Sequence, residues 1–248
     1  MNRYLMPLGF ISVFVVSFLI WANMQLFIGH FGEEMKKAGP LVALLIALLI
    51  LQIAFVLERL WSLKKAEGTG SLPMFLNSVR KQLHAGDVDG AVLLCNKQKG
   101  SAANVMRAGL ERYRALRSEN APKEKIQAET QAAIQEAAGL ETPLLERNLI
   151  AMSTIASIGT MVGLLGTTVG MIRSFQALGT TGAVDASALA TGISEALINT
   201  AGGLFVAILG IVFYNVFVTR VDSFNYMIDE ASYEVLQLLT AKAHSDAK

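Results

Sequence analysis

One carboxylate, Glu195, lies inside a long apolar stretch of this sequence. If the stretch is a membrane helix, Glu195 sits about nine residues from its outer end, about 14 Å deep at 1.5 Å per residue. A charge near the bilayer centre costs about 2.5–3.5 kcal/mol on insertion scales, so such residues usually face protein or water and mark ion pathways. Two interpretations stay open: Glu195 takes part in ion passage, or it is a structural glutamate that is neutral or paired with Arg173.

The polar side chains near Glu195 divide between two faces of the predicted helix. Successive residues of an α-helix are 100° apart, which places Thr191, Asn199 and Gly202 within about 40° of Glu195. Thr200 is rotated from Glu195 by about 140°. We therefore expect that Glu195 and Thr200 need not face the same cavity.

Small residues recur at helical spacing in this stretch and in the apolar stretch before it. In the earlier one, Gly159, Gly163, Gly166 and Gly170 share one stripe. Small residues let membrane helices approach closely, and hydroxyls beside such a seam can bond across it or line a polar path. The polar and small residues expected to support a site here are Thr168, Thr191, Asn199, Gly163, Gly166, Gly170, Gly202 and Gly203.

The composition indicates a membrane protein. The 248 residues are 53% hydrophobic and 17% charged, whereas soluble domains usually carry about 25% charged residues. A bilayer core of about 30 Å needs about 20 apolar helical residues, and four stretches reach that length. We therefore predict an all-α, polytopic helical membrane protein with four transmembrane helices and a helical cytoplasmic region.

Basic residues predict the orientation of these helices. Most Lys and Arg side chains lie between Arg59 and Arg147, and cytoplasmic loops of membrane proteins are rich in both. Both termini are then cytoplasmic. In chain order we expect an additional N-terminal transmembrane helix at 1–29, a periplasmic loop at 30–39, a transmembrane helix at 40–62, a cytoplasmic helical region at 63–148, a transmembrane helix at 149–178, a periplasmic loop at 179–186, a transmembrane helix at 187–219 and a cytoplasmic C-terminal helix or tail at 220–248.

Residues 1–29 have a second interpretation, as a signal peptide. Arg3 precedes the apolar run, as in a signal peptide. The apolar run is longer than a usual signal-peptide core, however, and no small-x-small cleavage site follows it. These two features favour a membrane span that is kept.

Nothing in the sequence indicates an enzyme. There is no nucleotide-binding loop, no nucleophile elbow and no metal-ligand spacing, so we expect no catalytic residues, no cofactor and no metal. The net charge of +1 argues against a nucleic-acid partner. The single cysteine, Cys95, is interpreted as a small buried residue.

Two motifs on adjacent predicted spans resemble a known family. They are Gly-Leu-Leu-Gly-Thr-Thr-Val-Gly at 163–170 and Gly-Ile-Ser-Glu-Ala-Leu-Ile-Asn-Thr-Ala at 192–201, flanked by Leu-Glu-Arg at 145–147 and Tyr-Asn-Val at 214–216. From about residue 146 to 238, the sequence resembles the ExbB/TolQ/MotA family of ion-channel motor subunits, and most of all its ExbB-like members.

The resemblance implies a homopentameric ring in the bacterial inner membrane. The ring would enclose a dimer of an ExbD-like single-span protein, whose aspartates carry protons, and a TonB-like protein would couple the proton motive force to transport across the outer membrane. Thr167 and Thr200 match the family's pore-lining threonines, and Glu195 matches its membrane glutamate. No aspartate lies in the predicted spans, as expected of a chain that lines the path while another chain carries the proton.

The resemblance leaves alternatives open. ExbB-like chains commonly have three spans, so segment 1–29 is additional. The chain resembles TolQ-type and gliding or flagellar stator subunits too, and the sequence does not separate H⁺ from Na⁺. A non-conducting membrane scaffold, with Glu195 structural, is a further alternative. A secondary transporter fits less well, because the sequence has no inverted repeat or broken helices.

Overall fold

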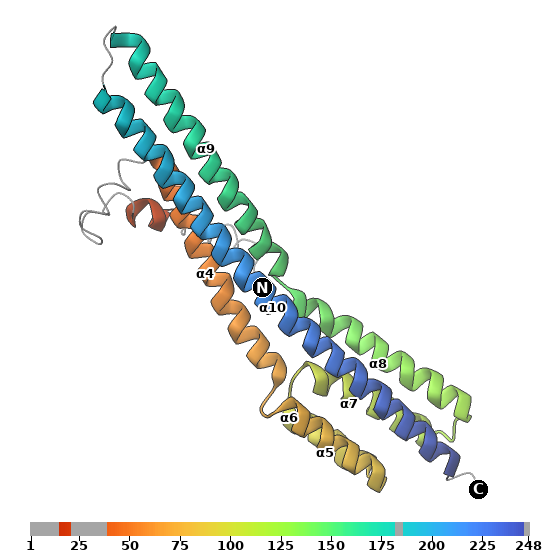
Figure 1. The fold of residues 1–248 in the computed structure, drawn as a ribbon. Helices are drawn as coiled ribbons and strands as arrows, with labels where there is room; N and C mark the ends of the chain where they lie inside the picture. The colour runs from red at the N-terminus through yellow and green to blue at the C-terminus, as the bar shows by residue number, and fades with distance from the viewer. Residues whose placement is uncertain (1–14, 21–38, 182–185, 246–248) are drawn as a thin grey trace. The chain divides into compact units, whose positions relative to one another are not determined.

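The computed structural model describes residues 15–20, 39–181 and 186–245 (Figure 1). Every regular element of this part is helical, as predicted. Beyond a short helical segment at 15–20, the helices are α4 (Pro40–Glu67), α5 (Leu72–Ala85), α6 (Val88–Gln98), α7 (Ser101–Ser118), α8 (Lys123–Glu146), α9 (Leu149–Thr181) and α10 (Ala186–Ser245).

Three helical stretches of the described part are long and apolar enough to cross a membrane. Their apolar parts are α4, α9 and the first half of α10, which correspond to the predicted spans 40–62, 149–178 and 187–219. The predicted span at 1–29 lies outside the described residues except for 15–20, so a fourth span stays a prediction. The predicted loop at 30–39 also lies outside them, except for Gly39.

The helices around the predicted loop at 179–186 extend into it, because α9 continues to Thr181 and α10 begins at Ala186. Helix α10 continues through residue 219 as one helix of 60 residues, so the change from membrane span to cytoplasmic segment predicted at 219/220 involves no helix break and stays a prediction. The charged residues that follow residue 219 end the apolar run, but no glycine or proline interrupts the helix there.

The chain divides into two compact units. The first contains residues 40–57 of α4, all of α9 and residues 186–216 of α10. Leu45 and Leu48 of α4 pack with Ile155 and Val162 of α9 and with Val206 of α10 in its core. Helices α9 and α10 run side by side as an antiparallel hairpin (Figure 1). This unit positions the candidate site.

The second unit contains residues 58–147 and the rest of α10 from residue 217. Helices α5 to α8 pack in sequence, α5 on α6, α6 on α7 and α7 on α8. Gly86 adopts the left-handed conformation at the end of α5, and Asp87 caps α6 by accepting a hydrogen bond from Gly90 N at 2.8 Å.

Buried polar groups of the second unit are well partnered around Arg59. Its guanidinium is fully buried, forms a two-point ion pair with Glu58 and donates to Leu145 O at 3.0 Å. Cys95 is free and buried, as predicted. Burial raises the pKa of the Cys95 thiol to about 12, so the thiol is neutral at physiological pH.

Candidate functional site

The glycines of α9 lie on the face that packs against α10. A Cβ atom on Gly163 would lie 3.1 Å from Gly203 Cα, and one on Gly203 would lie 2.7 Å from Gly163 Cα. A Cβ on Gly170 would meet Ala196 Cβ at 2.9 Å. Added side chains would therefore collide with the neighbouring helix, and the absence of side chains allows the close approach of the two backbones.

Thr200 bonds across this seam. Its Oγ1 donates to Gly163 O of α9 at 3.3 Å. In an α-helix the carbonyl of residue 163 also accepts from the backbone N–H of Thr167, one turn later. The structure therefore brings Thr167 and Thr200 to the same backbone carbonyl, one from each arm of the hairpin, and both side chains are half-buried in the isolated chain.

The other hydroxyls of the predicted site bond within their own helices. Thr167 Oγ1 donates to Leu164 O at 2.6 Å, and Thr168 Oγ1 to Leu165 O at 2.8 Å. Thr191 Oγ1 donates to the carbonyl four residues before it at 2.9 Å. Hydroxyls satisfied in this way can face an apolar surrounding without losing a hydrogen bond.

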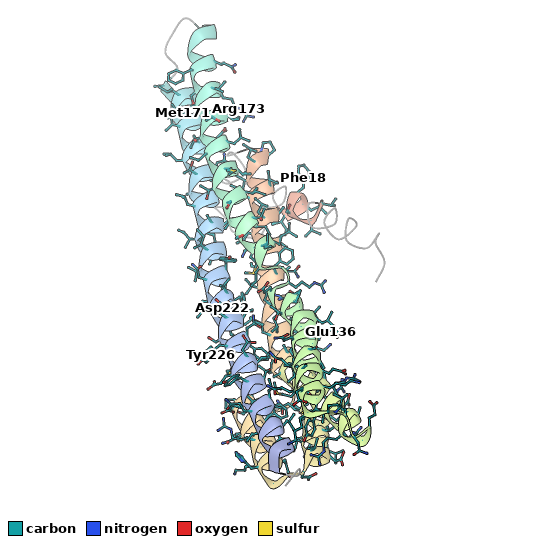
Figure 2. All side chains as sticks on the ribbon, turned by 90° about the vertical axis from the view of Figure 1, so that its right-hand side faces the viewer. Phe18, Glu136, Met171, Arg173, Asp222 and Tyr226 are labelled. Atoms are coloured by element: carbon teal, nitrogen blue, oxygen red, sulfur yellow. The ribbon has the colours of Figure 1, made fainter. Side chains whose placement is uncertain are left out.

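Glu195 faces a different part of the unit. Its Oε2 lies 3.7 Å from Nη1 of Arg173, which lies in the half of α9 toward the α9–α10 connection (Figure 2). The Glu195 side chain is 18% exposed and that of Arg173 is 54% exposed. The structural interpretation of Glu195, as a glutamate paired with Arg173, therefore has a geometric basis.

Two cavities meet at the Arg173–Glu195 pair. The smaller, about 160 Å³, lies between the start of α4 and the hairpin, and Asn199 and Gly166 line it with the pair. The larger, about 350 Å³, is lined by the pair together with Thr191. Neither cavity is lined by Thr167 or Thr200. The helical-wheel expectation that Glu195 and Thr200 need not face the same cavity thus agrees with the structure.

The remaining predicted residues complete the contact between the helices. Asn199 Nδ2 donates to Glu195 O at 3.0 Å. A Cβ added to Gly166 would lie 2.3 Å from Asn199 Cβ and would collide with it. Gly202 faces α4, where an added Cβ would lie 3.2 Å from Leu45 Cδ1. Glu195, Asn199 and Gly202 therefore share the face of α10 that turns toward α9 and α4.

The sequence reasoning missed Gln52 of α4. Its side chain is 1% exposed, and neither its amide nitrogen nor its oxygen has a hydrogen-bond partner among the described residues. It lies beside Gly210 of α10, where an added Cβ would be 3.5 Å from Gln52 Cδ and 2.7 Å from Ala156 Cβ. The signal that could have found it is its polarity, because no other polar side chain occurs at 41–57.

Within the described residues, no three His, Cys, Asp or Glu side chains are grouped as metal ligands would be. The polar groups of the hairpin near Thr200 and Glu195 are hydroxyls, the Asn199 amide and the Arg173–Glu195 ion pair. Such groups can exchange hydrogen bonds with water, with an ion or with a protonatable side chain.

Comparison with known proteins identifies the family. The model of the MotA/TolQ/ExbB proton channel family matches residues 97–230, which is more than half of the chain. The chain belongs to the MotA/TolQ/ExbB family. The matched region contains both motifs, at 163–170 and 192–201. The protein is therefore a membrane channel subunit of the MotA/TolQ/ExbB family.

Individual relatives include both ExbB-type and TolQ-type proteins. The ExbB-like 3 biopolymer transport protein of Synechocystis sp. is 45% identical over 91 residues, covering 36% of this chain and 43% of that protein. ExbB of Pseudomonas putida is 25% identical over 206 residues, covering 83% and 62%. TolQ of Pseudomonas aeruginosa is 35% identical over 117 residues, covering 47% and 51%. The chain thus spans less than two thirds of the length of these curated relatives.

Proposed function

We propose that this chain is the ring-forming subunit of an ExbB-type proton channel in the bacterial inner membrane. Five copies would enclose a dimer of an ExbD-like single-span protein. Proton flow through the ring would then drive a TonB-like protein that energises transport across the outer membrane. Relatives named as biopolymer transport proteins, ExbB of Pseudomonas putida among them, support this assignment.

The observation that carries the proposal is the meeting of Thr167 and Thr200 at Gly163 O. The Thr200 hydrogen bond of 3.3 Å is longer than the 2.5–3.0 Å usual for O–H···O bonds, so it is weak. Its hydroxyl can therefore turn from this carbonyl to a water molecule or a carboxyl group at low cost. The Thr167 hydroxyl bonds Leu164 O at 2.6 Å, so the exchangeable hydroxyl that each subunit gives to the inner wall of a ring would be that of Thr200, with Thr167 beside it.

The proton-carrying acid would come from another chain. Glu195 is the sole acid within the apolar parts of α4, α9 and α10, and it pairs with Arg173 beside cavities that the two threonines do not line. Its Oε2 already has an ion-pair partner within the same hairpin, 3.7 Å away, which suits a structural group better than a carrier. We assign Glu195, with Thr168, Thr191, Asn199 and the glycines, to supporting the hairpin.

Ring formation would also account for the apolar side chains that the hairpin exposes. Leu164 and Leu165 of α9 are 56% and 51% exposed, and Leu197 of α10 is 64% exposed. Such apolar surface needs lipid or neighbouring subunits to cover it. The half-buried Thr167 and Thr200 would lie where neighbouring hairpins face the lumen.

The test replaces Thr200 with Val, which keeps the side-chain shape and removes the hydroxyl. In cells lacking their own copy, we expect proton-motive-force-dependent uptake of an iron chelate to fall at least about tenfold, in line with the loss of a positioned proton-transfer group. Thr200→Ser should restore uptake. Thr154→Val is the matched control, because Thr154 is exposed and bonds only Ile150 O of its own helix.

Unchanged uptake together with an intact outer membrane in Thr200→Val at normal protein level would reject the pore-lining role. A TolQ-type subunit is the second candidate, and the match to TolQ of Pseudomonas aeruginosa favours it. It predicts normal uptake and a loss of outer-membrane integrity in the same variant. A non-conducting scaffold predicts no defect of either kind.

A further inference from the structure

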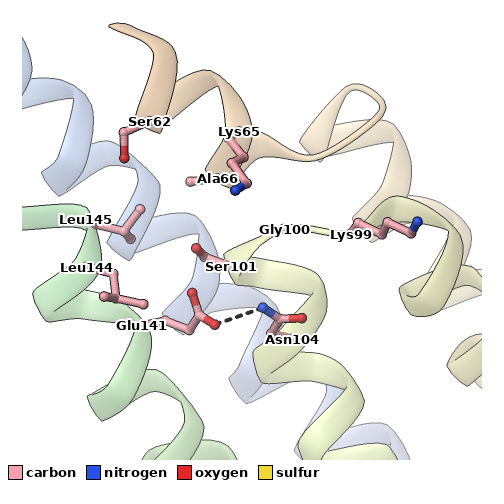
Figure 3. A pocket seen from close by; sticks show the side chains of 10 residues that line it. All are labelled: Ser62, Lys65, Ala66, Lys99, Gly100, Ser101, Asn104, Glu141, Leu144 and Leu145. Carbon is pink, nitrogen blue, oxygen red and sulfur yellow. Dashed lines mark hydrogen bonds between the residues drawn. The ribbon is translucent and has the colours of Figure 1, made fainter. Parts of the chain in front are cut away.

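A second polar cavity lies in the other unit, between the end of α4, the start of α7 and the end of α8 (Figure 3). Its volume is about 370 Å³. Ser62 and Lys65 of α4, Ser101 and Asn104 of α7, and Glu141 and Leu144 of α8 line it. The proposed channel function uses none of these residues.

The first turn of α7 opens on this cavity without a side-chain cap. The residue before the helix is Gly100, which offers no capping group, and the first backbone bond of the helix runs from Asn104 N to Gly100 O at 2.9 Å. The N–H groups at positions 101–103 precede that bond and have no helical acceptor. The start of an 18-residue helix also carries partial positive charge.

Ser101 adds a hydroxyl that has no hydrogen-bond partner among the described residues. The residue is 6% exposed, its side chain points into the cavity in Figure 3, and no described residue accepts or donates a bond to it. Ser62 across the cavity is half-buried and likewise has no hydrogen-bond partner among the described residues. Both hydroxyls line the cavity, so both are free to bond to a molecule that enters it.

The charges that face the cavity have opposite signs. Lys65 brings an ammonium group from α4. Glu141 accepts a hydrogen bond from Asn104 Nδ2 on its Oε1 at 2.8 Å, and its second oxygen has no partner among the described residues (Figure 3). The Lys99 side chain runs away from the cavity in the same view. A ligand that matches these charges has an anionic group, which contacts Lys65 and the start of α7, and a cationic group, which contacts Glu141.

We propose that this cavity binds a phosphate ester that bears a primary ammonium group, the phosphoethanolamine headgroup of a phospholipid. The phosphate would accept hydrogen bonds from Ser62, Ser101, Lys65 and the first turn of α7. The ammonium group would donate to the free oxygen of Glu141. Helix N-termini with a lysine are a common arrangement for phosphate.

The position along α4 favours a lipid over a free ester. From Pro40 to Trp61 the helix is about 33 Å long at 1.5 Å per residue, close to the hydrocarbon thickness of about 30 Å. Ser62 and Lys65 follow directly and so fall at headgroup level. Trp61 and Leu144 are 68% and 57% exposed, and Leu144 lines the cavity, which offers apolar surface to the acyl chains.

The test uses Trp61 as the probe. The chain has two tryptophans, and Trp21→Phe leaves only Trp61, whose ring lies 5.4 Å from the Lys65 ammonium. The full-length protein is placed in vesicles that mix phosphatidylethanolamine and phosphatidylcholine, one of them brominated on its acyl chains, and quenching gives the relative affinity. The two headgroups share the phosphate, but the quaternary ammonium of phosphatidylcholine has no N–H to donate to Glu141.

We expect a preference for phosphatidylethanolamine of about tenfold, the usual weight of a charge-assisted hydrogen bond. Glu141→Gln keeps the Asn104 bond and should bring the ratio to about one. Ser101→Ala removes a phosphate contact that both lipids share, so it should leave the ratio unchanged. Lys64→Gln and Ser118→Ala are the matched controls, since neither side chain lines the cavity, and they should keep the wild-type ratio.

A wild-type ratio of one would overturn the proposal. A ratio that Glu141→Gln leaves unchanged would overturn it too. Soluble phosphoethanolamine is added to the same vesicles as a separate arm. If it displaces no brominated lipid, the source is the bilayer, as proposed. If it quenches or shifts Trp61 emission in vesicles of phosphatidylcholine alone while the lipid ratio is one, the ligand is the free ester and the lipid assignment is wrong.

Discussion

Replacing Gly203 with Ala should separate the two arms of the hairpin, whereas replacing Gly202 with Ala should not. A Cβ on Gly203 would lie 2.6 Å from Gly159 O and 2.7 Å from Gly163 Cα. Both are backbone atoms, so neither can rotate away. Ordinary contacts of a Cβ begin at 3.4 Å, and α9 and α10 must therefore move apart by about 0.8 Å, the difference between 3.4 and 2.6 Å, near Gly163.

The size of the effect follows from that displacement. A gap of 0.5–1 Å forfeits about a quarter to a half of the dispersion energy of the contacts involved, and overpacking a helix contact typically costs about 1–3 kcal/mol. Ala is better than Gly in a helix by about 0.5–1 kcal/mol, which offsets part of this. At Gly202 the added Cβ meets the tip of Leu45 at 3.2 Å, which can rotate.

We therefore expect Gly203→Ala to be less stable than Gly202→Ala by about 2 kcal/mol. The assay is reversible unfolding of the purified full-length protein from mild detergent into sodium dodecyl sulfate, followed by circular dichroism. The two variants are neighbours in sequence and identical in composition, so differences in expression or detergent binding cancel. Equal free energies of unfolding, or a larger loss in Gly202→Ala, would refute the packing of α9 on α10 described above.

Three further predictions concern buried and paired groups. Arg59→Ala should lower the free energy of unfolding by about 3 kcal/mol, because it removes the buried bond to Leu145 O, and the exposed Lys64→Ala should change it by less than about 0.5 kcal/mol. A double-mutant cycle of Arg173→Gln with Glu195→Gln should give a coupling of about 0.5–1 kcal/mol, since Arg173 is half-exposed; a coupling near zero would remove the structural role of the pair. The Cys95 thiol should resist a disulfide reagent at pH 8 until the protein is unfolded, because burial raises its pKa to about 12. The unfolded thiol ionises near pH 8.5, whereas the folded one stays neutral to higher pH. The free energy of unfolding should therefore be unaffected by Cys95 below about pH 8.5 and fall as the pH rises toward 12, and Cys95→Ala should reduce that fall.

The apolar lengths and the glycine spacing were enough to predict the hairpin. Glycines at intervals of three and four residues predicted a close contact on one stripe of α9, and the structure has Gly163 and Gly203 backbone to backbone. The Asp87 cap of α6 has an equally local cause, since an aspartate before a helical run satisfies a free N–H. In each case the pattern and its physical cause lie within a few residues of one another.

The pairing of Arg173 with Glu195 could be named from the sequence only as an alternative. Its geometry depends on the register of α9 against α10. The glycine contact between the two helices sets that register over several turns, so no local sequence pattern indicates it. The bond from Thr200 to Gly163 O depends on the same register. Gln52 was missed because an amide inside an apolar run carries no motif. The assembly determines which residues of α9 and α10 face neighbouring subunits, and the sequence pattern of a single chain does not indicate that assembly.

Proton flux into liposomes tests the central claim most directly. The full-length chain is reconstituted with and without the ExbD-like partner, and an interior pH dye reports flux under an imposed potential. We predict no flux from the chain alone, flux with the partner, a loss of at least about tenfold in Thr200→Val, and recovery in Thr200→Ser. Flux from the chain alone that Glu195→Gln abolishes and Thr200→Val leaves intact would contradict the account and make Glu195 the carrier.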